Sequence, residues 1–151
     1  MGTLNKALSF VNARFLMDRQ PPTLYQTVAA EFMRQGYFAG HLRRMRLVYR
    51  EQRDALAAEL TRRVGDRVTL DVPDQGMHLV AHLGAQVSDV ALMHVAREHG
   101  IVVRAISGWY RRTPRRSALM PGFTGFPRVA IVPAAGRLAE IIERAPGGTT
   151  Q

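Results

Sequence analysis

The chain has 151 residues, of which 46% are hydrophobic and 22% are charged. This length suffices for one folded core, and the composition excludes a chain that is disordered throughout. No apolar run reaches the ~18 residues of a membrane-spanning helix, and the N-terminus does not resemble a signal peptide, so we expect a cytoplasmic protein without membrane contact. The lack of cysteine excludes disulfide bridges, cysteine zinc sites and a cysteine nucleophile.

The charge is strongly positive, with a net value of +9. Among the 21 lysine and arginine residues, Lys6 is the only lysine. A Schiff base to a lysine of this chain would therefore have to form at Lys6.

The first part of the chain predicts three helices. Apolar residues recur at helical spacing through residues 1–20, until Pro21 and Pro22 remove two amide donors. A second helix is predicted over residues 24–35, and Gly36 stops or bends it.

The third predicted helix, residues 37–64, carries an apolar stripe that we expect to face a core. A second stripe beside it consists of arginines: Arg43, Arg46, Arg50 and Arg53. The stripe is typical of a solvent-exposed helix shoulder, and it could alternatively follow a phosphate backbone. Arg50 and Asp54 are four residues apart, which predicts an ion pair.

The second half of the chain predicts a small sheet with helices. Residues 67–72 and 77–83 alternate apolar and polar side chains around a turn and predict an antiparallel hairpin. A helix, a strand that opens at Ile101, a short strand and a last helix are predicted at 88–99, 101–103, 118–120 and 128–144. We therefore predict an α/β (α+β) sandwich with its helices mainly on one face of the sheet.

The predicted organisation has three parts: an N-terminal helical segment at 1–35, a long helix with a small α/β domain at 36–145, and a disordered tail at 146–151.

Motifs for catalysis and metal binding are weak in this sequence. It contains neither a glycine-rich phosphate-binding loop nor a nucleophile elbow. His78 and His82 share one face of a predicted strand but lack a nearby carboxylate, so we expect no metal site. Asp71 and Asp74 flank a turn, where aspartate is expected to form local hydrogen bonds.

The segment between Glu98 and Glu140 is basic and contains no acidic residue. Its loop at 107–117 places Trp109 and Tyr110 beside several arginines. Aromatic planes that stack on bases and arginines that bind phosphates are typical of single-stranded nucleic-acid binding. The same loop could alternatively dock on an acidic partner or pack against a missing domain.

The segment DRQPP at residues 18–22, followed by LYQTVAAEFMRQGYFAGHLRRMRLVYREQRDAL, resembles the MocR type of GntR-family regulators. The segments DQGMHLVAHL, GIVVRAISGWY, ALMPGF and RLAEII extend the resemblance over about residues 8–145. Such regulators join a winged-helix DNA-binding domain to a fold-type-I aminotransferase-like domain that depends on pyridoxal 5'-phosphate. The resemblance implies that this chain corresponds to the small C-terminal domain of that fold and to the long connecting helix before it.

The resemblance also implies where functional residues lie. In the family the Schiff-base lysine, the other cofactor-binding residues and the DNA-binding domain all precede this segment, so we expect no catalytic, cofactor-binding or metal-binding residue here. Lys6 does not align with the family lysine, although GTLNKAL looks similar to its surroundings. Some members bind the substrate carboxylate with an arginine just before a Gly-Phe pair, where this chain has Met120. The candidates for interface or substrate-side residues are Arg19, Gln20, Trp109 and Tyr110.

The resemblance leads us to expect a fragment of a MocR-type regulator whose parent senses pyridoxal phosphate or an amino compound, or carries out transamination. The fragment is expected to be inactive alone and to bind no cofactor. Its expected partner is the missing large domain or a full-length homologue, because the family forms dimers and binds DNA through a domain absent here. The alternative is a small basic nucleic-acid-binding protein, or an interaction module, that uses the arginine-rich helix and the loop at 104–116.

Overall fold

The computed structural model describes the following residues of the chain: 2–18, 23–111 and 116–146. The predicted tail therefore lies outside the described residues from residue 147 onward. The chain divides into two compact units, Met1–Arg44 and Met45–Gln151.

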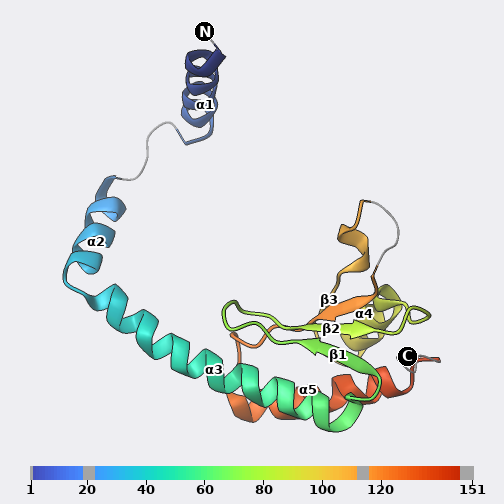
Figure 1. Ribbon diagram of the computed structural model, residues 1–151. Coiled ribbons are helices and arrows are strands. Elements are labelled where there is room, and N and C mark those ends of the chain that lie inside the picture. The colour runs from blue at the N-terminus through green and yellow to red at the C-terminus, as the bar shows by residue number, and fades with distance from the viewer. Residues whose placement is uncertain (1, 19–22, 112–115, 147–151) are drawn as a thin grey trace. The chain divides into compact units, whose positions relative to one another are not determined.

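The N-terminal unit is helical, as the apolar spacing predicted (Figure 1). Its elements are α1 (Gly2–Asp18), α2 (Thr23–Arg34) and the beginning of α3 (Tyr37–Val64). Gly36 separates α2 from α3 with a φ of +79°, a conformation that glycine adopts without steric cost. The predicted break at this glycine is confirmed.

The C-terminal unit contains the rest of α3 and a four-stranded sheet in which each neighbouring pair of strands is antiparallel. The strands are β1 (Val68–Asp71), β2 (Val80–Leu83), β3 (Arg104–Ala105) and β4 (Ala118–Met120), in the spatial order β1-β2-β4-β3. The other elements are α4 (Asp89–Glu98), the 3-10 turn η1 (Ser107–Trp109) and α5 (Arg128–Glu143). This arrangement confirms the predicted α/β fold and the predicted hairpin, which β1 and β2 form.

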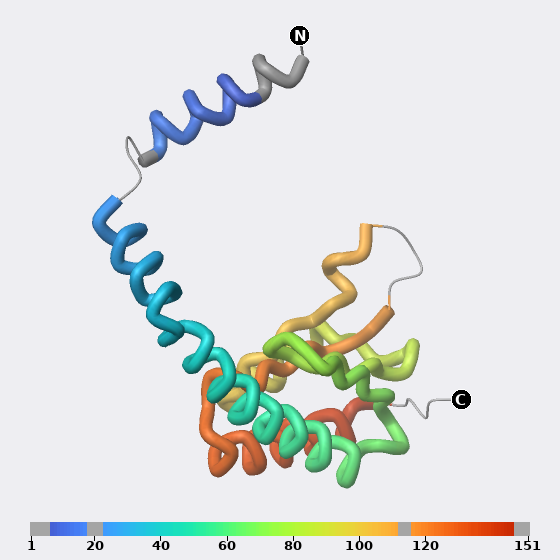
Figure 2. Tube along the Cα trace, turned by 60° about the vertical axis from the view of Figure 1, so that its left-hand side comes forward, coloured from blue at the N-terminus to red at the C-terminus, as the bar shows by residue number. Residues whose placement is uncertain are grey.

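The core of the C-terminal unit lies between the sheet and its helices. Helices α3 and α5 run side by side beneath the sheet in Figures 1 and 2. Buried side chains of α3, α4, α5 and the strands join in a single cluster. Its most deeply buried large members are Leu60, Leu79, Leu119, Phe123 and Leu138. Burying a leucine or phenylalanine of this kind stabilises the fold by about 1.5–3 kcal/mol.

The third strand begins later than the sequence pattern predicted. Ile101 and Val103 are buried, but the ladder starts only at Arg104. The reason is the end of α4, where the N–H of Ile101 donates to the carbonyl of Ala96 at 2.8 Å. Gly100 precedes Ile101 with a φ of +73°, so this backbone closes the helix before it can pair with a strand.

Gly136 on α5 lies against the end of the Arg63 side chain on α3. A Cβ atom at this position would lie 3.2 Å from Nη2 and 3.3 Å from Cζ of Arg63 on α3. Arg63 in turn bonds Glu59 at 2.6 Å and lies 3.5 Å from a carboxylate oxygen of Glu140. The glycine therefore gives space to an ion-pair network between the two helices.

Across the residues that the structure describes, we find no helix whose length and apolar character would allow it to span a membrane.

Candidate functional site

A buried carboxylate organises the edge of the sheet at β3, η1 and β4. Asp89, at the start of α4, is 2% exposed. Its Oδ2 accepts hydrogen bonds from the backbone N–H groups of Ile106 at 3.0 Å, Ser107 at 2.8 Å and Ala118 at 3.2 Å. Its Oδ1 accepts a bond from Oγ of Ser107 at 2.6 Å. One side chain thus connects α4 to the two segments that form this edge.

These hydrogen bonds keep the carboxylate ionised. Burial raises the pKa of Asp89, but the bonds from Ser107, Ala118 and Ile106 outweigh burial and hold the pKa below its ordinary value of 3.8. The N-terminus of α4 contributes partial positive charge at the same place. Hydrogen bonds to an ionised acceptor are stronger than neutral ones, so Asp89 fixes the backbone of this edge.

Two serines support Asp89. Oγ of Ser88 accepts from the N–H of Ala91 at 3.2 Å and so caps the start of this helix. Oγ of Ser117 donates to the carbonyl of Val87 at 2.5 Å and accepts from the N–H of Asp89 at 3.2 Å. The start of α4 and the start of β4 are therefore held together by side chains as well as by the core.

The predicted aromatic residues stand on this fixed edge. Trp109 ends η1 and is 60% exposed, and Tyr110 beside it is half-buried. Arg111 follows and is exposed, whereas residues 112–115 lie outside the described part of the chain. The structure thus presents an aromatic and basic surface, which we call the Trp109 edge (Ser107–Arg111).

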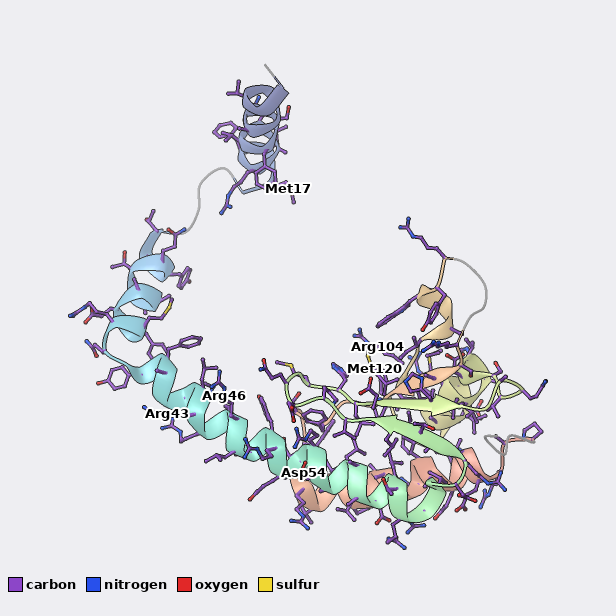
Figure 3. The ribbon with its side chains drawn as sticks, viewed as in Figure 1. Met17, Arg43, Arg46, Asp54, Arg104 and Met120 are labelled. Atoms are coloured by element: carbon purple, nitrogen blue, oxygen red, sulfur yellow. The ribbon has the colours of Figure 1, made fainter. Side chains whose placement is uncertain are left out.

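The open face of the sheet carries an arginine that the sequence pattern did not reveal. Arg104 on β3 pairs directly with Met120 on β4. Their chain neighbours Val103 and Leu119 are buried in the core, so both residues project to the opposite face of the sheet. Figure 3 shows Arg104 and Met120 next to each other, on the side of the sheet away from α3 and α5.

The arginine stripe of α3 divides by role. Arg53 has a side chain only 16% exposed, and it bonds Asp54 at 2.8 Å and the carbonyl of Pro73 at 3.0 Å. It therefore holds the hairpin turn against the helix. Within the described residues Arg50 forms no ion pair, so the predicted pair of Arg50 with Asp54 was wrong. Asp54 pairs with Arg53 instead, whose guanidinium also donates to the carbonyl of Pro73 in the hairpin turn.

The histidines do not form a metal site in the part of the chain that the structure describes. No group of three or more histidines, aspartates or glutamates there could hold a metal ion. His78 lies in an isolated bridge with Gly122, and His82 pairs with Thr69 on β1. Both therefore belong to the sheet framework.

An apolar cavity of about 270 Å³ opens between α3, α5 and the segments around Ile101 and Pro121. Its walls include Leu56, Ile131 and Leu138, and Arg137 is the one arginine among its lining residues. The cavity is suited to apolar groups and has no arrangement of acids and bases for catalysis.

The fold matches solved aminotransferases. LysN, the alpha-aminoadipate aminotransferase of Thermus thermophilus, superposes with a TM-score of 0.78 over 91% of this chain and 36% of its own, at 26% identity. The kynurenine aminotransferase of Pyrococcus horikoshii superposes with a TM-score of 0.77 over 87% of this chain and 32% of its own, at 23% identity.

The sequence is similar to that of transcriptional regulators. The probable rhizopine catabolism regulatory protein MocR of Rhizobium meliloti is 34% identical over 105 residues, which make up 70% of this chain and 21% of that protein. This chain is a distant homologue of the aminotransferase-like domain of MocR-type regulators. The HTH-type regulator YdeL of Bacillus subtilis is 26% identical over 66% of this chain and 22% of its own. No protein-family model matches the chain.

The described residues of this chain do not fit a pyridoxal cofactor by themselves. LysN was solved with N-(5'-phosphopyridoxyl)-L-leucine. A group of that kind needs a lysine or a phosphate cradle, and Lys6 lies among residues whose side chains the structure does not describe. The apolar cavity offers Arg137 and mainly hydrocarbon walls. We therefore assign no step of chemistry to the cofactor in this chain.

The sequence-based candidates have different outcomes. Trp109 and Tyr110 lie at the fixed sheet edge, whereas Arg19 and Gln20 lie outside the described residues. The sequence analysis missed Asp89 because the four groups that donate hydrogen bonds to it lie 17 to 29 residues further along the chain. The only local signal was its position after a helix cap, where an acidic residue is common.

Proposed function

We propose that this chain is the small-domain part of a MocR-type, aminotransferase-like transcriptional regulator that acts in the cytoplasm. The parent senses pyridoxal phosphate or an amino compound, or carries out transamination. This segment alone binds no cofactor and has no aminotransferase activity. The chain spans 21% of the MocR protein and 36% of LysN, which supports a role as one part of a larger unit.

The observation that carries this proposal is the lack of a core in the N-terminal unit. No residue described between Ala7 and Arg44 is buried, although α1 and α2 are rich in large apolar side chains. Those more than 70% exposed are Phe10, Leu16, Met17, Leu24 and Tyr25. Figure 3 labels Met17, near the end of α1. Apolar surface of this extent marks an interaction site, and we propose that the large domain of the parent covers it.

Addition of pyridoxal 5'-phosphate to the purified chain tests the catalytic part of the proposal. We expect no saturable aldimine absorption band and no cofactor-labelled peptide after borohydride reduction. The matched control is the Lys6→Ala variant, which should have the same spectrum as the parent chain. A saturable band that maps to Lys6 and disappears in the variant would refute the proposal.

A second candidate function is nucleic-acid binding, which the exposed Trp109 favours. It stands on a turn held by Asp89 and is followed by exposed Arg111. Stacking on such an aromatic residue contributes ~1–3 kcal/mol per base. If this function applies, the affinity for a mixed single-stranded oligonucleotide should fall by about one log unit per log unit of salt for each phosphate bound. Absence of binding at low salt would exclude it.

A further inference from the structure

The apolar cavity of about 270 Å³ lies between α5, α3 and the segments that precede β3 and follow β4. The side chains that α5 turns toward it are mostly small, and three of them are alanines: Ala130, Ala134 and Ala135. Its other walls include the buried side chains of Leu56, Ile101 and Val103. An apolar cavity of ~150 Å³ already holds benzene, so this one has room for a ring with a short chain.

Neighbouring elements hold the walls of the cavity in place. The carbonyl of Pro121 accepts from the N–H of Leu79 at 3.2 Å. Nε2 of Gln52, a residue of α3 that is 7% exposed, donates to the carbonyl of Phe126 at 2.7 Å. Because Pro121 and Phe126 both line the cavity, its shape is set before any ligand arrives, which lowers the entropic cost of binding.

The cavity is open to solvent at an apolar rim. Val102 and Phe126 belong to its lining, yet Val102 is 85% exposed and Phe126 is 66% exposed. A ligand therefore reaches the inner walls past hydrocarbon rather than past charged groups.

Arg137 is the one charged residue among the lining residues of the cavity. Its side chain is exposed, and within the described residues it forms no ion pair. The nearest acid on the same helix is Glu140, whose carboxylate lies 3.5 Å from Nη1 of Arg63. The cavity thus has a cation without an acidic partner at its wall, which favours an anionic ligand.

The position of Arg137 on α5 sets the length of such a ligand. Ala130, Ala134 and Arg137 are spaced by four and three residues, so they share one face of the helix. At 1.5 Å per residue, Ala130 and Arg137 are ~10 Å apart along the helix axis. Helical side chains lean toward the N-terminus, which brings the Arg137 side chain toward the alanines.

We propose that this cavity binds an aryl-alkyl carboxylate, a small organic anion with an elongated apolar body. The body lies along Ala130 and Ala134, and the carboxylate meets the guanidinium of Arg137 through two parallel N–H donors. Apolar walls with a few polar groups that fix the orientation are typical of ligand pockets. The inference goes beyond the proposed function, because it assigns a ligand site to the C-terminal unit itself.

The test is a titration of the full chain with 4-phenylbutyrate, followed by NMR at the methyl groups of Ile101, Val103 and Ile131. 4-Phenylbutanol, which has the same body without the charge, and acetate are titrated in parallel. We expect saturable shifts at these methyl groups with 4-phenylbutyrate, binding of the alcohol weaker by about threefold or more, and no saturation with acetate. Absence of saturable shifts with 4-phenylbutyrate, or equal affinity for the alcohol, would overturn the proposal.

A variant that fills the cavity tests its location. Ala134→Leu places a larger side chain in the cavity and should weaken 4-phenylbutyrate binding by about tenfold or more. The matched control is Ala58→Leu, at an exposed alanine of α3 outside the lining, which should bind as the parent does. Equal affinity of Ala134→Leu and the parent would refute the inference.

A second variant tests the charge without altering the core. Arg137→Gln changes only an exposed side chain, and it should bind 4-phenylbutyrate and 4-phenylbutanol with equal affinity. Arg128→Gln, at an exposed arginine of α5 outside the lining, should keep the preference of the parent for the anion. A preference that persists in Arg137→Gln would contradict the role of this arginine, and this test holds even where Ala134→Leu does not fold.

The titrations contain no pyridoxal phosphate, so their result is independent of the aldimine test. Failure of the cavity site would leave the absence of cofactor binding in force. An aldimine at Lys6 would refute the proposed function and leave the cavity titrations to stand on their own data.

Discussion

Replacement of Asp89 by alanine should strongly destabilise the C-terminal unit. The substitution leaves the N–H groups of Ser107 and Ala118 without their acceptor, whereas the N–H of Ile106 keeps its second bond, to the carbonyl of Ala118 at 3.0 Å. An unsatisfied buried donor costs about 1–3 kcal/mol. Because Ala118 is buried and Ser107 is half-buried, where water can partly reach it, we expect a total loss of about 2–5 kcal/mol in the free energy of unfolding.

Asp89→Asn is the matched control. Its amide oxygen can accept the three backbone N–H bonds in place of Oδ2, and its amide group can donate to Oγ of Ser107. Only the charge is lost, so we expect a cost of about 1–2 kcal/mol. Urea unfolding followed by the fluorescence of Trp109, the single tryptophan, measures both variants. An alanine variant within 1 kcal/mol of the parent (about the net value of one ordinary hydrogen bond) would refute this reasoning, as would equal losses in both variants.

The same clamp predicts a dependence on pH. The pKa of Asp89 is lower in the folded chain than its ordinary value of 3.8, so its contribution to stability is fully present above that value. The contribution is lost as the pH falls from about the ordinary value through the lower folded pKa. Unfolding measured at several acidic pH values should therefore show a smaller decrease in stability for Asp89→Asn than for the parent. Equal slopes would contradict the clamp.

Three further substitutions test the packing by urea unfolding. Gly136→Ala should leave the free energy of unfolding unchanged or raise it by up to ~1 kcal/mol, because alanine favours a helix more than glycine and the new Cβ meets only the end of the Arg63 side chain. A loss above about 1 kcal/mol would contradict this expectation. Gly65→Ala should destabilise instead, because its Cβ would lie 2.5 Å from the backbone oxygen of Thr61; unchanged stability would contradict that contact. Leu60→Ala should cost about 2–5 kcal/mol, since Leu60 is 0% exposed, and a smaller cost would show a looser core.

The elements that depend on local pattern could be predicted from the sequence. Alternation and a turn were enough to predict the hairpin, which pairs Val68 with Leu83. Apolar spacing predicted α3, and Gly36 marked the break before it. These predictions succeed because helix and strand periodicities, and the positive φ that glycine tolerates, are properties of neighbouring residues.

The features that depend on contacts between distant segments could not be predicted. Arg104 gained its neighbour Met120 through strand register, which no local pattern specifies. Asp89 gained its role from donors on two later segments, and Arg53 displaced Arg50 as the partner of Asp54 because the hairpin turn folds back onto α3. In each case the deciding atom comes from a part of the chain at least 15 residues away in sequence.

The most direct test of the central claim is to translate the DNA upstream of the Met1 codon in all three frames. We expect a reading frame that encodes a winged helix followed by a cofactor-binding large domain with its lysine. This frame would be either the same as that of the present chain or shifted from it by a frame change. The function would then belong to the whole regulator, and α1 and α2 would pack on that large domain. A promoter and a ribosome-binding site without such a frame would contradict the claim, and binding functions of the chain itself would then replace it.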